Sequence, residues 1–288
     1  NAQLRSLETQ DLGRIDVYAS DDGSTDGTLA ILHAWRSRWR KGAFEVFDGP
    51  GRGFAENFRS LLQLVPAGAG YYAFCDQDDV WDRDKLSVAA RALGRARDHA
   101  GLYCSRTRLI DARGLPRGLS PLFHRTPTFR NAIVQSLAGG NTMVLNRAGF
   151  ELVVESARRT GFVSHDWWCY QLLSGAGGHI HYDPVPRVGY RQHTANAVGN
   201  NTGLAAKLFR LRMLLAGRFT SWNSANLASL ELCSDLLSEE ARLTLRDFRH
   251  VRAASPLAAL GALRQSGIYR QTLAGDVSLS VAAILGKV

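Results

Sequence analysis

In the stretch Tyr71-Tyr72-Ala73-Phe74-Cys75-Asp76-Gln77-Asp78-Asp79-Val80-Trp81, an apolar run is followed directly by three carboxylates. The run Tyr71–Cys75 has the length and composition of a buried strand, and the carboxylates begin where it ends. Carboxylates this close repel one another unless a cation or hydrogen bonds compensate them. Oxygen ligands of this kind suit Mg²⁺ or Mn²⁺, which bind one or two carboxylates together with substrate phosphates. A solvated acidic turn is the alternative, and the flanking strand and Trp81 weaken it.

The same order of apolar strand and acidic loop occurs nearer the N-terminus. Ile15–Ala19 is predicted as a strand that ends in Ser20-Asp21-Asp22-Gly23. Around these strands the pattern predicts further elements, namely helices over Ala2–Gln10, Thr28–Trp39 and Phe54–Leu64 and a strand over Phe44–Phe47. Such alternation is typical of an α/β fold with a mainly parallel, Rossmann-like central sheet. Ligands bind at the carboxyl edge of such sheets, so we expect both acidic stretches there. For the first stretch, a capped turn with solvated carboxylates is the alternative.

The chain divides near residue 200 into two predicted regions. Residues 1–200 form the α/β domain, with further strands expected over Leu102–Ile110 and Met143–Leu145. Residues 201–288 form a helical C-terminal region, in which Ser255-Pro256 marks a helix start because serine caps helices and proline suits their first position. Because the alternation opens with a helix, we also expect that a first strand is missing before Ala2.

Composition excludes several classes of protein. Apolar residues make up 45% and charged residues 21% of the chain, as in ordinary soluble proteins. The four cysteines form no C-x-x-C pair, which argues against a zinc site or a disulfide framework and favours reduced thiols in a cytoplasm. The net charge of +9 indicates an anionic partner. Nucleic acid is not expected to be that partner, because no helix-turn-helix, zinc spacing or aromatic-basic strand motif supports it.

A basic amphipathic stretch at Leu204–Arg218 offers another explanation of the charge. It places Lys207, Arg210 and Arg212 among apolar residues at helical spacing. Such a helix can lie peripherally on an anionic membrane surface, or it can pack its apolar stripe on the catalytic domain. The sequence leaves both interpretations open.

Taken together, the motifs resemble those of family 2 glycosyltransferases of the GT-A fold, and most closely the bacterial rhamnosyltransferase branch. Their joint order and spacing carry the resemblance, which covers residues 1 to about 200. The matching segments are Ser20–Thr28, Gly53–Phe58, Asp76–Trp81, Asp84–Leu86, Gly140–Thr142, His165–Trp168 and Tyr190–His193, followed by Asn196 and Gly199. The resemblance departs at the front, where family members carry a first strand that lines the nucleotide pocket.

The resemblance implies roles for the acidic residues. Asp21 or Asp22 would contact the base or ribose of the nucleotide. Of the D-x-D motif, Asp78 would be the metal ligand and Asp76 would lie nearer the ribose while also able to reach the metal. Asp79 could assist either. The catalytic base would be Asp166, in His165-Asp166-Trp167-Trp168.

The resemblance also implies roles for neighbouring residues. Arg191 would reach the diphosphate and His193 the metal, although a lone histidine is as often a plain polar residue. The acceptor and sugar side of the pocket would be lined by Trp81, Asn141, Trp167 and Trp168. For the tryptophan pair, ordinary helix packing with Asp166 as a first-turn cap is the alternative.

The resemblance therefore predicts an inverting glycosyltransferase that depends on Mg²⁺ or Mn²⁺. Its donor would be a nucleotide-sugar, dTDP-L-rhamnose, and its acceptor a glycan or lipid-linked glycan of the bacterial surface. The enzyme would act in the cytoplasm. If it binds the membrane, it would do so peripherally, at the inner face of the cell membrane. A nucleotidyltransferase is one alternative, because it also combines an α/β sheet with metal-binding carboxylates. A non-catalytic nucleotide-sugar or carbohydrate-binding module is another.

Overall fold

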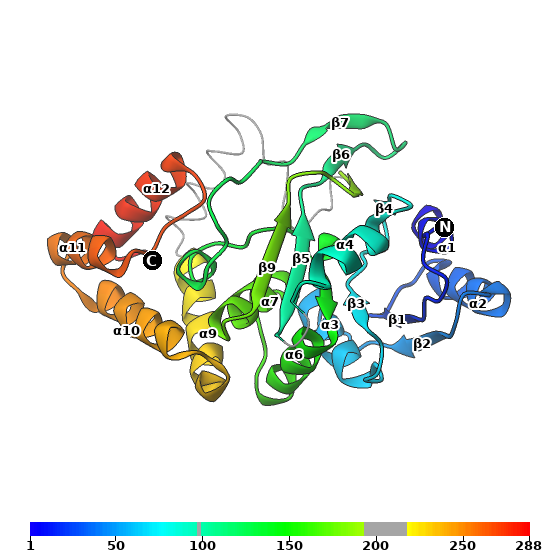
Figure 1. Ribbon diagram of the computed structural model, residues 1–288, viewed down its shortest axis with the longest axis horizontal. Helices are drawn as coiled ribbons and strands as arrows, with labels where there is room; N and C mark the ends of the chain where they lie inside the picture. Colours follow the sequence, from blue (N-terminus) through cyan, green and yellow to red (C-terminus); the bar gives the residue numbers. More distant parts are fainter. Residues whose placement is uncertain (97–98, 193–217) are drawn as a thin grey trace.

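The protein is described by a computed structural model, which covers residues 1–96, 99–192 and 218–288. Figure 1 shows an elongated molecule with strands at its centre and at its N-terminal end, and helices alone at its C-terminal end. The first elements are α1 (Ala2–Glu8), β1 (Val17–Asp21), α2 (Thr28–Arg38), β2 (Phe44–Asp48) and α3 (Phe54–Leu64). They match the predicted order of helices and strands, with ends that differ by a few residues.

The N-terminal layer is a parallel pair of strands covered by helices. β1 and β2 run parallel, with Val17 opposite Phe44 and Asp21 opposite Asp48. Trp35 at the end of α2 and the neighbouring Trp39 pack with Phe44 in one buried cluster, to which α1 also contributes. This packing holds β1 and β2 in place, so that the carboxyl ends of both strands point in the same direction.

The central sheet has the order β3-β8-β5-β9. Its strands are β3 (Tyr71–Ala73), β5 (Gly101–Ser105), β8 (Val144–Asn146) and β9 (His179–Asp183). The side chains of β5 alternate between two buried clusters, because successive residues of a strand point to opposite faces. Leu102 and Cys104 pack towards α6 (Arg147–Arg159) and α7 (His165–Gly175), while Tyr103 packs against α4 (Lys85–Leu93). The sheet therefore has helices on both faces.

A third sheet brings distant segments beside the acidic stretch. It has the order β4-β10-β6-β7, formed by β4 (Val80–Trp81), β10 (Val188–Arg191), β6 (Arg108–Ile110) and β7 (Pro116–Leu119). In β10, Gly189 lies opposite Val80 of β4 on one side and Arg108 of β6 on the other. The loop before β4 is thereby held next to the end of β10.

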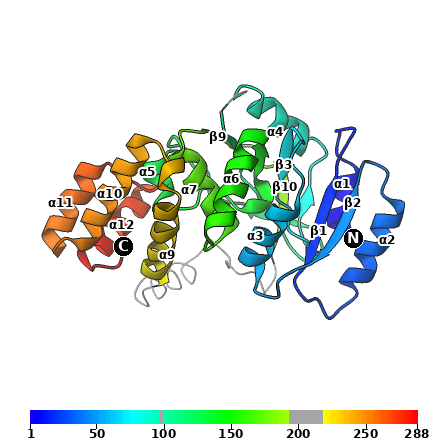
Figure 2. The same ribbon diagram turned by 90° about the horizontal axis from the view of Figure 1, so that it is seen from below.

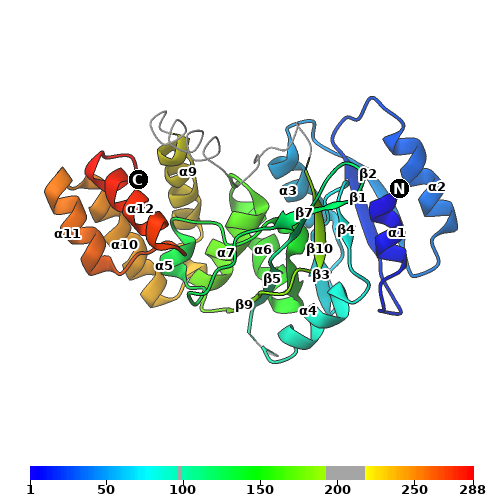
Figure 3. The same ribbon diagram turned by 90° about the horizontal axis from the view of Figure 1, so that it is seen from above.

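The C-terminal region is helical, as predicted. It contains α9 (Arg218–Leu232), α10 (Glu239–Ala253), α11 (Pro256–Ser266) and α12 (Leu273–Ile284). The short helix α5 (Phe129–Ala132) comes earlier in the chain, before β8. Figures 2 and 3 show α10, α11 and α12 at the opposite end of the molecule from α1 and α2. Ser255 precedes α11 and Pro256 begins it, as expected. No helix among residues 1–96, 99–192 and 218–288 combines the length and apolarity needed to cross a bilayer.

The hydrophobic core runs from the α/β region into the C-terminal helices without interruption. Trp168 of α7, Leu227 of α9, Phe248 of α10 and Leu263 of α11 belong to one buried cluster. The predicted boundary near residue 200 lies outside the described residues. So does the predicted basic stretch Leu204–Arg218, apart from Arg218, at which α9 begins.

Two features of the predicted sheet differ from the observed one. The α/β class is confirmed, but strand pairing is mixed, since β3 and β5 both run antiparallel to β8. The predicted strand Leu102–Ile110 is divided into β5 and β6, which belong to different sheets. The chain leaves the central sheet at Arg106, whose N–H donates to Asp183 O, and the Thr107 N–H then donates to Ser120 Oγ at 3.0 Å.

Candidate active site

Asp79 anchors the acidic loop between β3 and β4. Its carboxylate is fully buried. Asn141 Nδ2 donates to Asp79 Oδ2, and the Arg191 N–H donates to Asp79 Oδ1 at 3.0 Å. Asn141 lies in a 3-10 turn, Gly140–Thr142, that leads into β8. Asp79 therefore joins three separate segments and fixes the loop that carries Asp76 and Asp78. Asn141 shapes the site through Asp79.

The acidic loop concentrates negative charge. Burial raises the pKa of Asp76 to about 7, and the charges of Asp79, Asp78 and Asp166 add to the effect. Burial also raises the pKa of Asp79 to about 6, although its bonds from Asn141 and Arg191 oppose the shift. Asp76 therefore lies within reach of three further carboxylate charges, and a bound cation would relieve the repulsion among them.

Asp166 lies in the first turn of α7. Its Oδ1 accepts a hydrogen bond from the Trp167 N–H at 2.7 Å, and the side chain stays partly exposed. Its charge reaches the acidic loop, because it is one of the causes of the raised pKa of Asp76. The structure thus brings the predicted base, Asp166, into one electrostatic cluster with two of the predicted metal ligands, Asp76 and Asp78.

Tyr190 of β10 is a member of this cluster that the sequence reasoning missed. Burial raises its pKa to about 12, and the charges of Asp79, Asp76, Asp78 and Asp166 contribute. Tyr190 stands directly before Arg191 in the segment Tyr190–His193, and this position is the signal in the sequence that could have identified it. The phenol stays protonated near neutral pH, so it can offer an O–H donor next to the four carboxylates.

Arg191 fastens the acidic loop to the turn between β6 and β7. Its Nε donates to the Asp78 carbonyl at 2.8 Å, and its Nη1 donates to the carbonyls of Asp111 and Ala112 at 2.9 and 2.8 Å. The positive charge therefore lies against the acidic loop in a fixed orientation. His193 lies outside the described residues.

His165 fills a buried space beside Asp166. Its ring centroid lies 4.0 Å from that of Phe58 and 4.8 Å from that of Phe74. Burial lowers its pKa to about 4, so the imidazole is neutral near physiological pH. Gly140 lies so close that an added Cβ would come within 1.9 Å of His165 Nε2. His165 therefore joins α3, the end of β3, the 3-10 turn and α7 at the base of the site.

The first acidic stretch organises the loop before α3. Asp22 accepts hydrogen bonds from the N–H groups of Gly51 and Gly53, both at 2.7 Å. Gly53 has a φ of 87°, in the left-handed region that favours glycine, and α3 begins directly after it. A hydrogen bond from the Ser24 side chain lowers the pKa of Asp21, and Asp21 Oδ2 also accepts the Ser24 N–H at 2.9 Å.

Helix α3 links the first acidic stretch to the second. At its start, Asn57 accepts a hydrogen bond from Ser20 Oγ at 2.6 Å, which joins the helix to β1. The next residue, Phe58, contacts the rings of Phe74 and His165. One helix thus positions both the loop of Asp22 and the base of the Asp76–Asp166 cluster.

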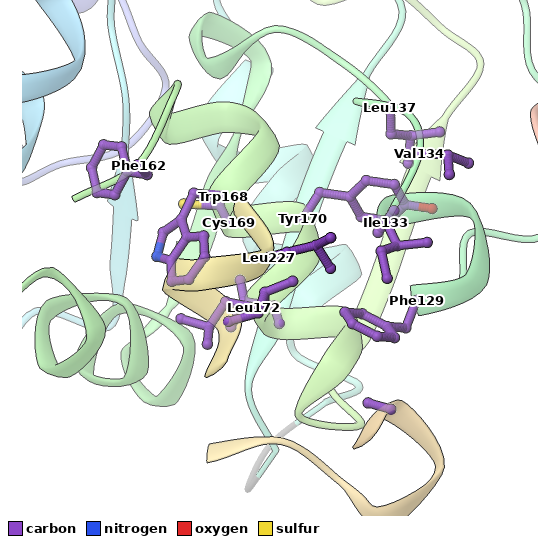
Figure 4. Packing of buried hydrophobic residues seen from close by; sticks show 14 of the residues in the cluster. Phe129, Ile133, Val134, Leu137, Phe162, Trp168, Cys169, Tyr170, Leu172 and Leu227 are labelled. Atoms are coloured by element: carbon purple, nitrogen blue, oxygen red, sulfur yellow. The ribbon is translucent and has the colours of Figure 1, made fainter. Parts of the chain in front are cut away.

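The three tryptophans expected at a sugar pocket are buried. Trp167 Nε1 donates to the Ala132 carbonyl at 2.7 Å, and Trp168 Nε1 donates to Ser156 Oγ at 2.9 Å. Figure 4 shows Trp168 among core side chains that include Leu172 and Leu227. The ring of Trp81 is covered by Lys85, whose Nζ lies 3.1 Å from the ring centroid. The geometry favours the packing interpretation for all three.

The carboxylates of the acidic loop suit a divalent ion that is held partly by its substrate. Within the described residues, no three His, Cys, Asp or Glu side chains form a closed metal cage. Mg²⁺ and Mn²⁺ sites that also hold substrate phosphates need only one or two carboxylates. Asp76 and Asp78 meet that requirement, and their mutual repulsion favours an added cation. The residues present therefore fit a divalent ion that binds with its substrate.

The chain is similar to known proteins in sequence and in fold. Residues 2–150 match the model of the family described as glycosyl transferase family 2. The dTDP-rhamnosyl transferase RfbG of Shigella flexneri is 26% identical over 224 residues, which cover 74% of each chain. The crystal structure of S. aureus TarS 1-349 in complex with UDP-GlcNAc aligns with a TM-score of 0.50 at 16% identity, over 91% of this chain and 76% of that one. That likeness concerns the fold alone.

Proposed function

The chain belongs to glycosyltransferase family 2, and from this membership we propose that it transfers L-rhamnose from dTDP-L-rhamnose to a hydroxyl of a growing bacterial surface glycan. It is a glycosyltransferase of the GT-A fold with a C-terminal helical region. The similarity to a dTDP-rhamnosyl transferase supports the donor. The observation that carries the proposal is the cluster of Asp76, Asp78 and Asp166 beside a buried anchor, Asp79. The acceptor would be a glycan or lipid-linked glycan in the cytoplasm, at the inner membrane face.

The residues of the donor side have distinct proposed roles. Asp78, with help from Asp76, would hold Mg²⁺ or Mn²⁺, and His193 is a further candidate ligand. Such an ion stabilises the diphosphate leaving group when it is bound. Arg191 lies against the same loop with its charge fixed, which suits a diphosphate contact. Asp21 and Asp22 shape the loop that would receive the nucleotide.

Asp166 is the proposed base. The acceptor oxygen forms a bond to the anomeric carbon as the bond from that carbon to the diphosphate oxygen breaks. The acceptor proton passes to the Asp166 carboxylate. Because attack comes from the face opposite the diphosphate, the anomeric configuration inverts and no covalent enzyme intermediate is needed. Asn141 and Tyr190 would orient groups around this centre, through Asp79 and through a phenolic O–H.

A donor screen tests the proposal directly. The purified chain is incubated with dTDP-, UDP- and GDP-sugars, with Mg²⁺, with Mn²⁺ or with EDTA, and nucleotide release is measured. We expect metal-dependent binding and release with dTDP-L-rhamnose, and weaker responses with the other donors. If another nucleotide-sugar is preferred, the rhamnose assignment is wrong. If none binds with any metal, the transferase mechanism proposed for this site is wrong.

Metal affinity is expected to rise with pH through about 7. A proton and a cation compete for Asp76, whose pKa is raised to about 7. At pH 6 this carboxyl is roughly nine-tenths protonated, so Mn²⁺ affinity should fall about tenfold per pH unit below 7. Titration calorimetry with Mn²⁺ and dTDP between pH 5.5 and 8.5 measures it. Asp76→Asn should flatten the profile, and an unchanged slope in that variant would contradict the assignment.

Without the cation, the same shift predicts a fold that loses stability as pH rises. The folded-state pKa of Asp76 is above the unfolded value, so folding favours its protonated form. This contribution is fully present below about pH 4 and is lost as pH rises through about 7. Thermal melts in EDTA across that pH range should show the loss of stability that comes from Asp76. Asp76→Asn should remove that part of the pH dependence, whereas an identical profile in the variant would contradict the assignment.

Asn141→Ala is expected to destabilise the protein. The substitution leaves Asp79 Oδ2 buried without its donor, and an unsatisfied buried acceptor costs about 1–3 kcal/mol. Thermal denaturation should show a fall of several degrees in Tm. Gln63→Ala, at an exposed position of α3, is the control and should change stability by less than about 0.5 kcal/mol. Equal Tm values for the two variants would show that Asn141 does not support the loop.

A further inference from the structure

Helix α12 has an exposed apolar stripe. Leu273, Val277, Val281, Ile284 and Leu285 are all exposed, Leu273 by 85% of its surface. Leu273, Val277 and Val281 follow one another at intervals of four residues, and Ile284 and Leu285 lie three and four residues beyond Val281. This spacing places all five on one side of the helix. Single exposed apolar residues are ordinary on a protein surface, but a contiguous row of five is characteristic of an interaction site.

The inner side of α12 is already occupied by the core. Leu279, Ala282 and Ala283 are buried in the main hydrophobic cluster. A surface helix normally carries polar residues opposite its buried stripe, whereas α12 is apolar on both sides. Leu257, 84% exposed at the start of α11, adds a further apolar residue on the helix that packs beside α12.

The charges of this helical pair are mostly positive. From residue 254 to residue 288, the basic residues are Arg264, Arg270 and Lys287, and the acidic one is Asp276. Asp276 is neutralised from outside the pair, because Arg125 Nη1 donates to its Oδ2 at 2.7 Å. An apolar stripe on a helical pair of net positive charge matches a lipid surface, whose acyl chains are apolar and whose headgroups are anionic.

We propose that the outer face of α12, with Leu257, docks this protein onto the surface of an anionic lipid bilayer. The helix would lie in the plane of the interface, with the stripe among the acyl chains and the basic residues at the headgroups. Figures 1, 2 and 3 place α12 among the C-terminal helices, in the opposite half of the molecule from α2, so docking there leaves the N-terminal layer clear of the membrane. A second copy of the chain is the weaker occupant, because it would bring like charges together. This inference does not rest on the donor or the acceptor.

Vesicle sedimentation of the full chain tests docking without any nucleotide-sugar. We expect binding to vesicles of phosphatidylglycerol and phosphatidylcholine, weaker binding to phosphatidylcholine alone, and a decline with added salt. Leu273→Glu combined with Val277→Glu should reduce binding to the anionic vesicles by tenfold or more. Leu64→Glu combined with Leu243→Glu adds the same charge at exposed leucines outside the stripe, and should lower binding far less.

Three outcomes would overturn the proposal. The first is equal vesicle binding by the stripe variant and the wild type. The second is an equal loss in the control variant, which would show a general charge effect. The third is a dimer in sedimentation velocity that the stripe substitutions dissociate, together with no vesicle binding by the wild type. If the stripe variant unfolds at a lower temperature than the wild type, the double variant Arg264→Gln with Lys287→Gln is measured instead. Loss of the preference for anionic vesicles in that variant would support docking, and retention of the preference would oppose it.

Discussion

Asp166→Asn is expected to abolish sugar transfer and to leave donor binding intact. The amide cannot accept the acceptor proton, and loss of a positioned base typically lowers the rate by about 10²–10⁴-fold. The local structure should survive, because the amide oxygen can still accept the Trp167 N–H that Asp166 Oδ1 accepts at 2.7 Å. The expected signature is a reduced kcat with a donor Kd within about twofold of the wild type.

Nucleotide release under saturating donor and acceptor measures kcat, and titration calorimetry with the donor measures its Kd. Asp247→Asn, the same chemical change at an exposed position of α10, is the matched control and should retain full turnover. The Asp166 variant should also show a lower pKa for Asp76, because one of the charges that raise it is gone. Metal affinity should therefore reach its plateau at a lower pH. Wild-type turnover by Asp166→Asn would remove Asp166 from the role of base.

The sequence predicted those parts of the fold that local pattern controls. The predicted helix Phe54–Leu64 has the observed bounds, because Gly53 supplies the backbone turn and the apolar spacing of the helix is unambiguous. Strand direction was not predictable in this way. Whether β3 pairs parallel or antiparallel with β8 depends on contacts more than 60 residues apart along the chain, and no periodicity within either segment records it.

Within the site, the sequence identified carboxylates but not their hydrogen-bond partners. Asp76, Asp78 and Asp79 are adjacent and chemically alike, and only the fold distinguishes them. Asn141 and Arg191 donate to both carboxylate oxygens of Asp79, which is why Asp76 and Asp78, and not Asp79, are the proposed ligands. Burial explains why Trp168, expected at a sugar pocket, lies in the core. Trp168 suits a sugar-binding surface or a core equally well by composition, and its contact with Ser156 places it in the core.

Asp78→Asn is expected to remove most of the metal dependence of donor binding. Removing a metal ligand should cost at least the roughly 10–100-fold in affinity that loss of an outer partner costs at metal sites. Stability should change little, since Arg191 Nε holds the Asp78 main-chain carbonyl, which the substitution retains. Donor titrations with Mn²⁺ and with EDTA give the measurement. The two curves should converge in the variant and remain apart in the wild type.

Asp79→Asn is the informative comparison, because it makes the same change one residue away. Its carboxylate is buried and accepts from both Asn141 and Arg191, so an amide there must lose one acceptor and set an N–H₂ group against a donor. We therefore expect a lower Tm with the metal dependence of donor binding retained at low temperature. The two variants should thus separate a ligand from an anchor. Equal donor binding by the wild type and Asp78→Asn, with loss of metal dependence in Asp79→Asn, would reverse the two assignments and make Asp79 the ligand.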